Sequence, residues 1–260
     1  PPMTDRPELP RSALGALSSP IGLSVGTRDL LPARAALRRA LAHTTLERFA
    51  RWGYAQVIPP AFEREAVLAR GLGPRARSEL VRFLDPDTGE VLALRPDMTP
   101  QVARIVATRY RDAPMPVRLA YEGSVVRRPR GRARRQRQRA QAGIECVGWA
   151  TADADAEVIA ATLDALRALG LDGLQVELSH AAFLTPLVDA LPPPLREPAA
   201  DAVTARDAAT WRALLADHPD TVATLAALDD LAGPAAVLDA ADSHPGVSAA
   251  FAGPLEALRA

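Results

Sequence analysis

A run of arginines lies between two apolar stretches of this chain. Residues 127–139 read RRPRGRARRQRQR, with eight arginines in thirteen residues. A hydrophobic core does not hold that many guanidinium groups, so we expect a solvated loop here. VRLAYEGSVV at 117–126 precedes the run and IECVGW at 144–149 follows it, and both are typical of strands. The sequence therefore predicts a long hairpin arm whose clustered guanidinium groups suit anionic ligands.

The remaining composition is that of an ordinary globular protein. The 260 residues allow one large domain or two smaller ones, and 48% are hydrophobic and 24% charged. The net charge is zero, which argues against a dedicated nucleic-acid-binding domain, although the arm creates a local positive field. The chain has no Lys and no Asn. This bias weakens an argument from the number of arginines, but not one from their clustering.

The cysteine and histidine content speaks against disulfides and metal sites. Cys146 is the only cysteine, which excludes an internal disulfide and a Cys-rich metal site. The four histidines have no spacing typical of metal ligands, and they are His43, His180, His218 and His244. We expect no cofactor and no bound metal. The lone cysteine, with no signal-peptide pattern and no apolar run of membrane-spanning length, predicts a cytoplasmic protein.

Hydrophobic periodicity predicts an α+β domain followed by short helices. The expected elements are a helix over 30–52, a strand over 54–60, a hairpin over 81–95, a helix over 99–112, a helix over 152–170 and a strand over 174–179. Thr99 is expected as the N-cap of its helix. Beyond residue 181, Ala- and Leu-rich sequence broken by PPP, HPD and GP predicts several helices. We expect a loose tail over 1–20, a domain over 21–185 and a helical appendage over 186–260.

Six blocks of the sequence resemble, in order, the catalytic fold of histidyl-tRNA synthetases. They are GTRDLLP at 26–32, FARWGYAQVIPPAFE at 49–63, LRPDMTPQVAR at 94–104, YEGSVVR at 121–127, QAGIECVG at 141–148 and DAEVI at 155–159. LRPDMTPQVAR is closer to a paralogous family, the regulatory subunits of short-form ATP phosphoribosyltransferase, the first enzyme of histidine biosynthesis. The resemblance implies a class II aminoacyl-tRNA synthetase-like antiparallel sheet flanked by helices.

The arm departs from the synthetase pattern at the two positions that contact adenine in that family. In that family the first arginine of the arm holds the ATP α-phosphate, an acidic residue two positions later contacts the adenine amino group, and an aromatic residue stacks on the ring. Here Arg127 keeps the first position, whereas Pro129 and Arg139 stand at the other two. Proline offers neither a carboxylate nor an N–H group. The resemblance therefore implies a noncatalytic protein without catalytic residues of its own.

The positions that hold histidine in the family are retained. By resemblance, Asp97 and Thr99 meet the α-amino group, while Gln141 and Glu145 lie around the amino group and the imidazole. Arg127 is suited to the ligand carboxylate. The residues alone also allow a simpler interpretation, in which Asp97 and Thr99 only stabilise a helix N-terminus. Glu145 lies in an otherwise apolar strand, where a carboxylate is costly unless it is paired.

Three functions are open at the level of the sequence. The first and favoured one is a regulatory subunit that senses L-histidine, binds the short-form ATP phosphoribosyltransferase catalytic subunit and forms a dimer within a hetero-oligomer. The second is a histidyl-tRNA synthetase fragment, which needs an acidic residue at position 129. The third is an RNA-binding module, which predicts aromatic residues inside the arm where none occurs. We expect no membrane partner.

Two further family motifs, the second histidine-binding loop and the block with an ATP-binding arginine, do not occur in this sequence. We therefore expect the fold to be truncated, with a sheet that lacks its last strands.

Overall fold

The computed structural model describes residues 23–24, 26–128, 136–230, 233–234, 236 and 251–259. The tail expected over 1–20 lies outside these residues, as do Pro129 and the arginines between 130 and 135. The chain forms two compact units that divide after Asp172. Residues 174–179, predicted as a strand of the first domain, fall in the second of these units and form no strand.

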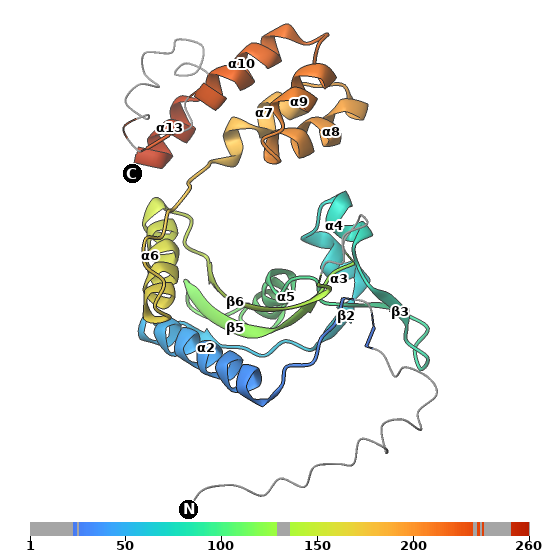
Figure 1. Ribbon diagram of the computed structural model, residues 1–260, viewed down its shortest axis with the longest axis vertical. Helices are drawn as coiled ribbons and strands as arrows, with labels where there is room; N and C mark the ends of the chain where they lie inside the picture. Colours follow the sequence, from blue (N-terminus) through green and yellow to red (C-terminus); the bar gives the residue numbers. More distant parts are fainter. Residues whose placement is uncertain are drawn as a thin grey trace, which may run out of the picture. The chain divides into compact units, whose positions relative to one another are not determined.

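The first unit combines two three-stranded sheets with helices (Figure 1). Its helices are α2 (Pro32–Arg51), α3 (Glu65–Arg70), α4 (Pro74–Ser78), α5 (Thr99–Arg109) and α6 (Ala152–Ala168). Its strands are β1 (Ala55–Gln56), β2 (Phe62–Arg64), β3 (Arg82–Leu84), β4 (Val91–Leu94), β5 (Val117–Val126) and β6 (Gln138–Val147). The three long helices and the strands on both sides of the arm were all predicted, and the structure confirms them.

The larger sheet has the strand order β1-β5-β6. β5 and β6 form a ten-residue antiparallel ladder that runs from Val117 opposite Val147 to Val126 opposite Gln138. The β5-β6 pair has the predicted antiparallel arrangement, and β1 adds a short parallel pairing with β5 at the edge of the sheet. This parallel pairing is possible because the chain between β1 and β5 is long and passes through β2 to α5, and parallel neighbours need such a crossover connection. β1 is shorter than predicted, since Pro59 and Pro60 cannot donate to a ladder.

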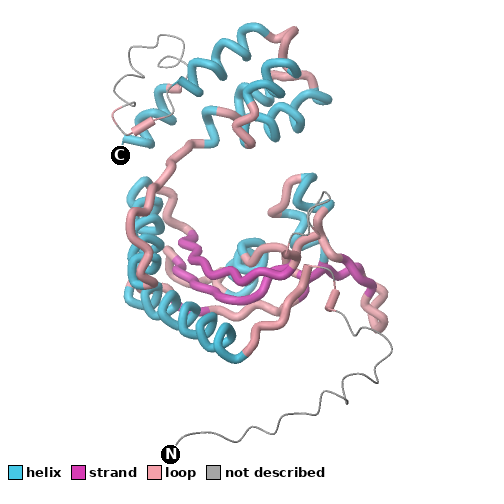
Figure 2. The backbone as a smooth tube through the Cα atoms, viewed as in Figure 1, coloured by secondary structure: helices cyan, strands magenta, loops and turns pink. Residues whose placement is uncertain are grey.

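Both faces of this sheet are covered, as the tube in Figure 2 shows for the helices around β5 and β6. Alternate residues of a strand point to opposite faces. One face packs on α5 and its first turn, in a buried cluster of Met98, Val102, Val106, Val117, Leu119, Tyr121 and Val125. The opposite face packs on α2 and α6, in a buried cluster of Phe49, Tyr54, Ala120, Ile144, Ala161 and Ala165.

The smaller sheet has the order β2-β4-β3 and is antiparallel throughout. β3 and β4 form the hairpin predicted from the DPDTG turn. Gly89 in that turn has a φ of 69°, a left-handed conformation that favours glycine. The Asp85 carboxylate accepts the backbone N–H of Asp87, which closes the turn locally.

Two local predictions are wrong. Met98, not Thr99, is the N-cap of α5, and the Asp97 carboxylate accepts the Thr99 N–H at 3.0 Å. An acidic side chain thus does the capping and leaves the Thr99 hydroxyl available elsewhere. Residues 174–179 form no strand, and Val176 is 45% exposed. A strand needs a neighbour to satisfy its backbone groups, and the part of the chain that the structure describes supplies none here.

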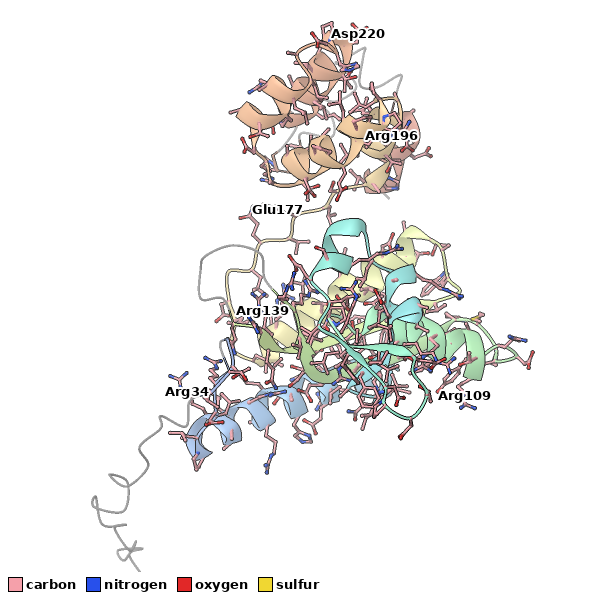
Figure 3. All side chains as sticks on the ribbon, turned by 90° about the vertical axis from the view of Figure 1, so that its right-hand side faces the viewer. Arg34, Arg109, Arg139, Glu177, Arg196 and Asp220 are labelled. Carbon is pink, nitrogen blue, oxygen red and sulfur yellow. The ribbon has the colours of Figure 1, made fainter. Side chains whose placement is uncertain are left out.

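The second unit is helical, as predicted for the C-terminal region. It contains a 3-10 turn at Ala181–Phe183 and the helices α7 (Thr185–Asp189), α8 (Pro193–Thr204), α9 (Ala208–Leu214), α10 (Pro219–Asp230) and α13 (Ala252–Arg259). Its core is formed by Leu191, Ala199, Ala202, Trp211, Leu215 and Leu225. Charged side chains such as Arg196 and Asp220 lie on its exterior (Figure 3). Among the described helices, none has the length and apolar character needed to cross a bilayer.

Candidate functional site

The side chains of interest meet where the first turn of α5 lies against the β5-β6 ladder. Gln141 and Glu145 are four residues apart on β6, so strand alternation places both on the same face as Tyr121 of β5. That face also carries the cluster packed on α5. The α5 N-terminus brings Asp97 and Thr99 to the same place, so the site combines one helix start with two adjacent strands.

Asp97 is the centre of a hydrogen-bond network at this point. Its Oδ1 accepts the Thr99 N–H at 3.0 Å and the Gln141 amide Nε2 at 3.2 Å. Its Oδ2 pairs with Nη2 of Arg127 at 3.2 Å. The Arg127 Nε donates to the carbonyl of Pro96 at 2.8 Å, which holds the guanidinium beside the α5 start. Both oxygens of Asp97 are therefore engaged by protein donors.

Glu145 forms the second half of the same network. The Thr99 hydroxyl donates to its Oε1 at 2.7 Å, and the Tyr121 hydroxyl donates to the same oxygen at 3.2 Å. Thr99 thus links the two carboxylates, with its N–H on Asp97 and its hydroxyl on Glu145. Thr99 and Arg127 are exposed, while Asp97, Gln141 and Glu145 are half-buried, so the site is open to solvent on one side.

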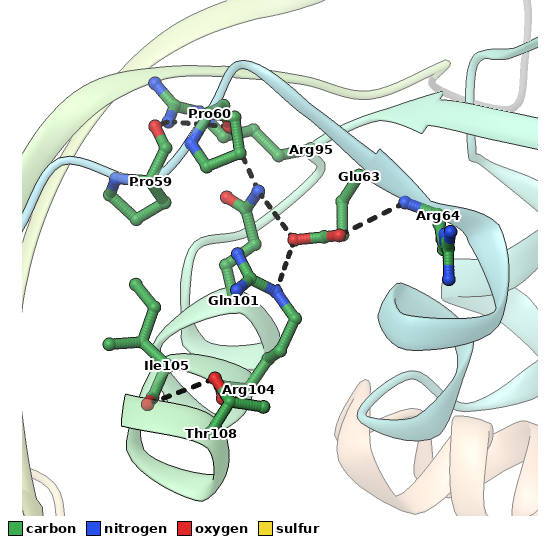
Figure 4. Close-up of polar contacts among 9 residues, drawn as sticks. All are labelled: Pro59, Pro60, Glu63, Arg64, Arg95, Gln101, Arg104, Ile105 and Thr108. Atoms are coloured by element: carbon green, nitrogen blue, oxygen red, sulfur yellow. Dashed lines mark hydrogen bonds and ion pairs between the residues drawn. The ribbon is translucent and has the colours of Figure 1, made fainter. Parts of the chain in front are cut away.

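Arg95 holds the backbone that leads into the site (Figure 4). This arginine is buried, and its guanidinium donates to the carbonyls of Ser124 at 2.7 Å and Pro59 at 2.8 Å. Burial lowers its pKa, and the nearby Glu122 opposes that effect. A Cβ at Gly123 would collide with the Arg95 guanidinium, so only glycine leaves room for that side chain. Arg95 therefore ties β5 to the loop that carries Asp97.

A neighbouring polar cluster secures α5 to β2 (Figure 4). Gln101 is fully buried and donates to the Pro60 carbonyl at 3.0 Å. Arg104 pairs with Oε2 of Glu63 at 2.7 Å. Since the three side chains bridge the helix and the smaller sheet, they stabilise the position of the α5 start rather than add groups to the site itself.

The site has unused acceptors and an excess of negative charge. Oε1 of Gln141 is buried and has no hydrogen-bond partner. Among the described residues, no donor is assigned to Oε2 of Glu145 either. The network contains two carboxylates, Asp97 and Glu145, and one guanidinium, Arg127, which pairs with Asp97. The arrangement suits a ligand that brings several N–H groups together with one anionic group for Arg127.

The structure brings all five predicted residues into this one network. Sequence reasoning missed Tyr121 and Arg95, although both lie within the YEGSVVR and LRPDMTPQVAR blocks. Each could have been found as a large polar side chain in an apolar setting. Tyr121 lies on the buried face of strand β5, and Arg95 directly follows strand β4. Arg139 is exposed at the start of β6 (Figure 3), and Pro129 lies outside the described residues. Within the described ranges, no group of three His, Cys, Asp or Glu side chains is arranged to hold a metal ion.

A sequence model of the histidyl-tRNA synthetase family matches residues 26–260. This chain belongs to that family. An ATP phosphoribosyltransferase regulatory subunit of Syntrophotalea carbinolica is 37% identical over 221 residues, which are 83% of this chain and 52% of the relative. The subunit of the same name from Anaeromyxobacter sp. strain K is 39% identical over 215 residues, which cover 82% of this chain and 62% of the relative.

Solved structures give the same picture of this family member. A crystal structure from Bacillus halodurans, described as an ATP phosphoribosyltransferase regulatory subunit/histidyl-tRNA synthetase, matches with a TM-score of 0.75 at 26% identity. The match covers 92% of this chain and 64% of that structure. The predicted fold class, an α+β class II synthetase-like fold with flanking helices, is confirmed. The chain spans roughly half to three fifths of the length of these two curated relatives.

Proposed function

We propose that this chain acts as a noncatalytic regulatory subunit of short-form ATP phosphoribosyltransferase, which binds L-histidine as its feedback effector. The observation that carries the proposal is the network joining Asp97, Thr99 and Glu145 with Gln141 and Arg127. The curated relatives named above bear the name of that subunit, which supports the choice of partner.

The chemistry of the site supports an amino acid as the ligand. The unpaired Oε1 of Gln141 is a ready acceptor for an ammonium group. Arg127 uses its Nε and Nη2 on Pro96 and Asp97, which leaves further guanidinium donors for a carboxylate. Glu145 keeps one oxygen for a nitrogen donor on the ligand side chain, and an imidazole carries such a group. A histidine zwitterion therefore complements each part of the network.

The arm supports the noncatalytic part of the proposal. Arg139 stands where the synthetases carry an aromatic side chain for adenine, and position 129 is a proline rather than an acid. We expect no formation of histidyl-adenylate. A pyrophosphate exchange assay with histidine and ATP is expected to stay at background. Histidine-dependent exchange above background would instead favour the synthetase alternative.

Histidine binding is the direct test of the site. We expect L-histidine to bind in isothermal titration calorimetry and to raise the melting temperature with increasing concentration. Glu145→Ala should weaken binding by about tenfold or more, because a hydrogen bond to a charged group is lost. Glu122→Ala is the matched control, since Glu122 lies on β5 but faces the opposite side of the sheet and pairs with Arg38. Equal affinities of the wild type and Glu145→Ala would contradict the proposal.

The partner and the assembly belong to the same proposal. We expect the chain to bind the short-form catalytic subunit and to make its turnover sensitive to histidine, and a cytoplasmic location fits this role. Self-association as a dimer is supported by exposed apolar side chains in the first unit, where Leu37 of α2 is 59% and Ile58 after β1 is 80% exposed. Light scattering of the chain alone and with the catalytic subunit measures both associations.

A further inference from the structure

Tyr121 places a hydroxyl group inside the candidate site from a buried position. Its side chain is 4% exposed and packs in the cluster between β5 and α5. The hydroxyl lies 3.2 Å from Oε1 of Glu145 and 3.5 Å from Oγ1 of Thr99. A tyrosine that only filled the core would not need to aim its hydroxyl at a carboxylate, because a buried phenylalanine fills the same space.

Gly143 makes room for this hydroxyl. It stands directly opposite Tyr121 in the β5-β6 ladder, between the two site residues Gln141 and Glu145. A Cβ at position 143 would lie 2.5 Å from the Tyr121 hydroxyl oxygen and 2.7 Å from the ring carbon that bears it. Real Cβ atoms do not approach other atoms so closely. The phenol can therefore cross β6 and reach Glu145 only where the opposing residue has no side chain.

The donors around Glu145 converge on one of its two oxygens. Burial, together with the Glu145 and Asp97 carboxylates, raises the pKa of Tyr121 to about 12, so its hydroxyl keeps its proton at neutral pH. The Thr99 hydroxyl also carries one proton, and it donates to Oε1 of Glu145 at 2.7 Å. Both protons thus point at Oε1. Oε2 has no assigned donor among the described residues and is not one of their buried unpaired atoms, so it is open to solvent or to a ligand.

We propose that Tyr121 is a positioning residue that makes the site selective for a ligand side chain with an N–H donor. With Thr99 it fixes Glu145 through Oε1, so that Oε2 stays open as the acceptor for one ring N–H of the ligand. The inference rests on the proposed function and adds to it the residue that orients the Glu145 carboxylate toward the imidazole. A ring of the same size without an N–H would cover Oε2 without pairing it, and a carboxylate oxygen that a ligand shields from water without a hydrogen bond is costly.

The test compares two ligands and two matched variants. Tyr121→Phe removes the hydroxyl and keeps the ring in the core. Tyr110→Phe is the control, since Tyr110 is half-buried and its hydroxyl has no hydrogen bond among the described residues. L-Histidine and β-(2-thienyl)-L-alanine, whose five-membered ring has no N–H, are titrated into each full chain by calorimetry. Melting temperatures without ligand show whether each variant is folded.

We expect Tyr121→Phe to lower the affinity for histidine by about threefold to tenfold, the effect of one lost hydrogen bond. The affinity for thienylalanine should stay the same, so the preference for histidine shrinks by that factor. Tyr110→Phe should change neither affinity. An equal loss for both ligands would show a purely structural role and overturn the inference, as would unchanged histidine binding in Tyr121→Phe. No histidine binding by the wild type would overturn the proposed function as well.

Discussion

Two glycines in the strands leave space that neighbouring side chains of the site occupy. At Gly123 a Cβ would meet the guanidinium of Arg95, and at Gly143 it would meet the Tyr121 phenol. Both neighbours are held by hydrogen bonds, Arg95 to backbone carbonyls and Tyr121 to Glu145, so neither can move away freely. Glycine is therefore required at these two strand positions, where its weak strand propensity would otherwise be a disadvantage.

Gly143→Ala tests this requirement. Forcing a methyl group into this space should lower the free energy of unfolding by about 1–3 kcal/mol, as overpacking does. Gly253→Ala is the control, because a Cβ there meets no atom within 4 Å and the residue lies in α13. That change should be neutral or slightly stabilising. Urea denaturation measures the free energy of unfolding of both variants. An unchanged stability of Gly143→Ala would mean that the Tyr121 side chain moves aside without loss of stability, and it would contradict the requirement for glycine.

At the level of elements, one carboxylate ties α6 to the larger sheet. Glu157 of α6 accepts two hydrogen bonds from Arg118 of β5, at 2.8 Å and 2.9 Å, and one from the Tyr54 hydroxyl at 2.9 Å. Arg118 in turn lies over the Trp149 ring, 5.4 Å from its centroid. Burial and the bond to Glu157 raise the pKa of Tyr54. Glu157 thus joins α6 to β5 and to Tyr54, which directly precedes β1.

Glu157→Gln should lower the free energy of unfolding by about 1–3 kcal/mol at neutral pH, the range for hydrogen bonds to charged groups. The Arg118 bond is the main reason that the pKa of Glu157 lies below its ordinary value of 4.5. The carboxylate therefore stabilises the fold fully above about pH 4.5 and loses this effect as the pH falls through its lowered pKa. Denaturation of both proteins from pH 7 to pH 3 should show the difference shrinking at the acid end. A constant difference would contradict the ion-pair explanation.

At the level of the whole molecule, the two units have separate cores. The first is built around the β5-β6 ladder, and the second packs its helices around Trp211 and the fully buried Leu215. The candidate site lies entirely in the first unit, since its residues come from α5, β5, β6 and the loops beside them. The helical unit contributes none of the groups in that network.

Leu215→Ala should therefore destabilise the second unit by about 2–5 kcal/mol, as for other large-to-small core changes. Hydrogen exchange followed by mass spectrometry should show faster exchange in α8, α9 and α10. Exchange in β5 and β6 should stay unchanged, and so should histidine binding. Faster exchange throughout the first unit would mean that the two units unfold cooperatively.

Much of the fold could be predicted from local pattern. The helices α2, α5 and α6 and the strands around the arm follow from periodicity and turn residues, which act between near neighbours. The failures are non-local. Thr99 was expected to cap α5, but its hydroxyl is held by Glu145, 46 residues away. The 174–179 stretch alternates like a strand, yet alternation does not supply a neighbouring strand, and the parallel pairing of β1 depends equally on a distant partner.

The long helices, the strands around the arm and the five candidate residues could be predicted from the sequence and its resemblance to a family, and so could the absence of an acidic residue at position 129 and of an aromatic one at position 139. The tertiary structure decided how those residues act together. Only the β5-β6 register places Gly143 opposite Tyr121, and only the packing of α5 on that face brings Thr99 to Glu145. The physical reason is that hydrogen-bond geometry is set by distances of about 3 Å between atoms, whereas the contacts come from segments far apart in the chain.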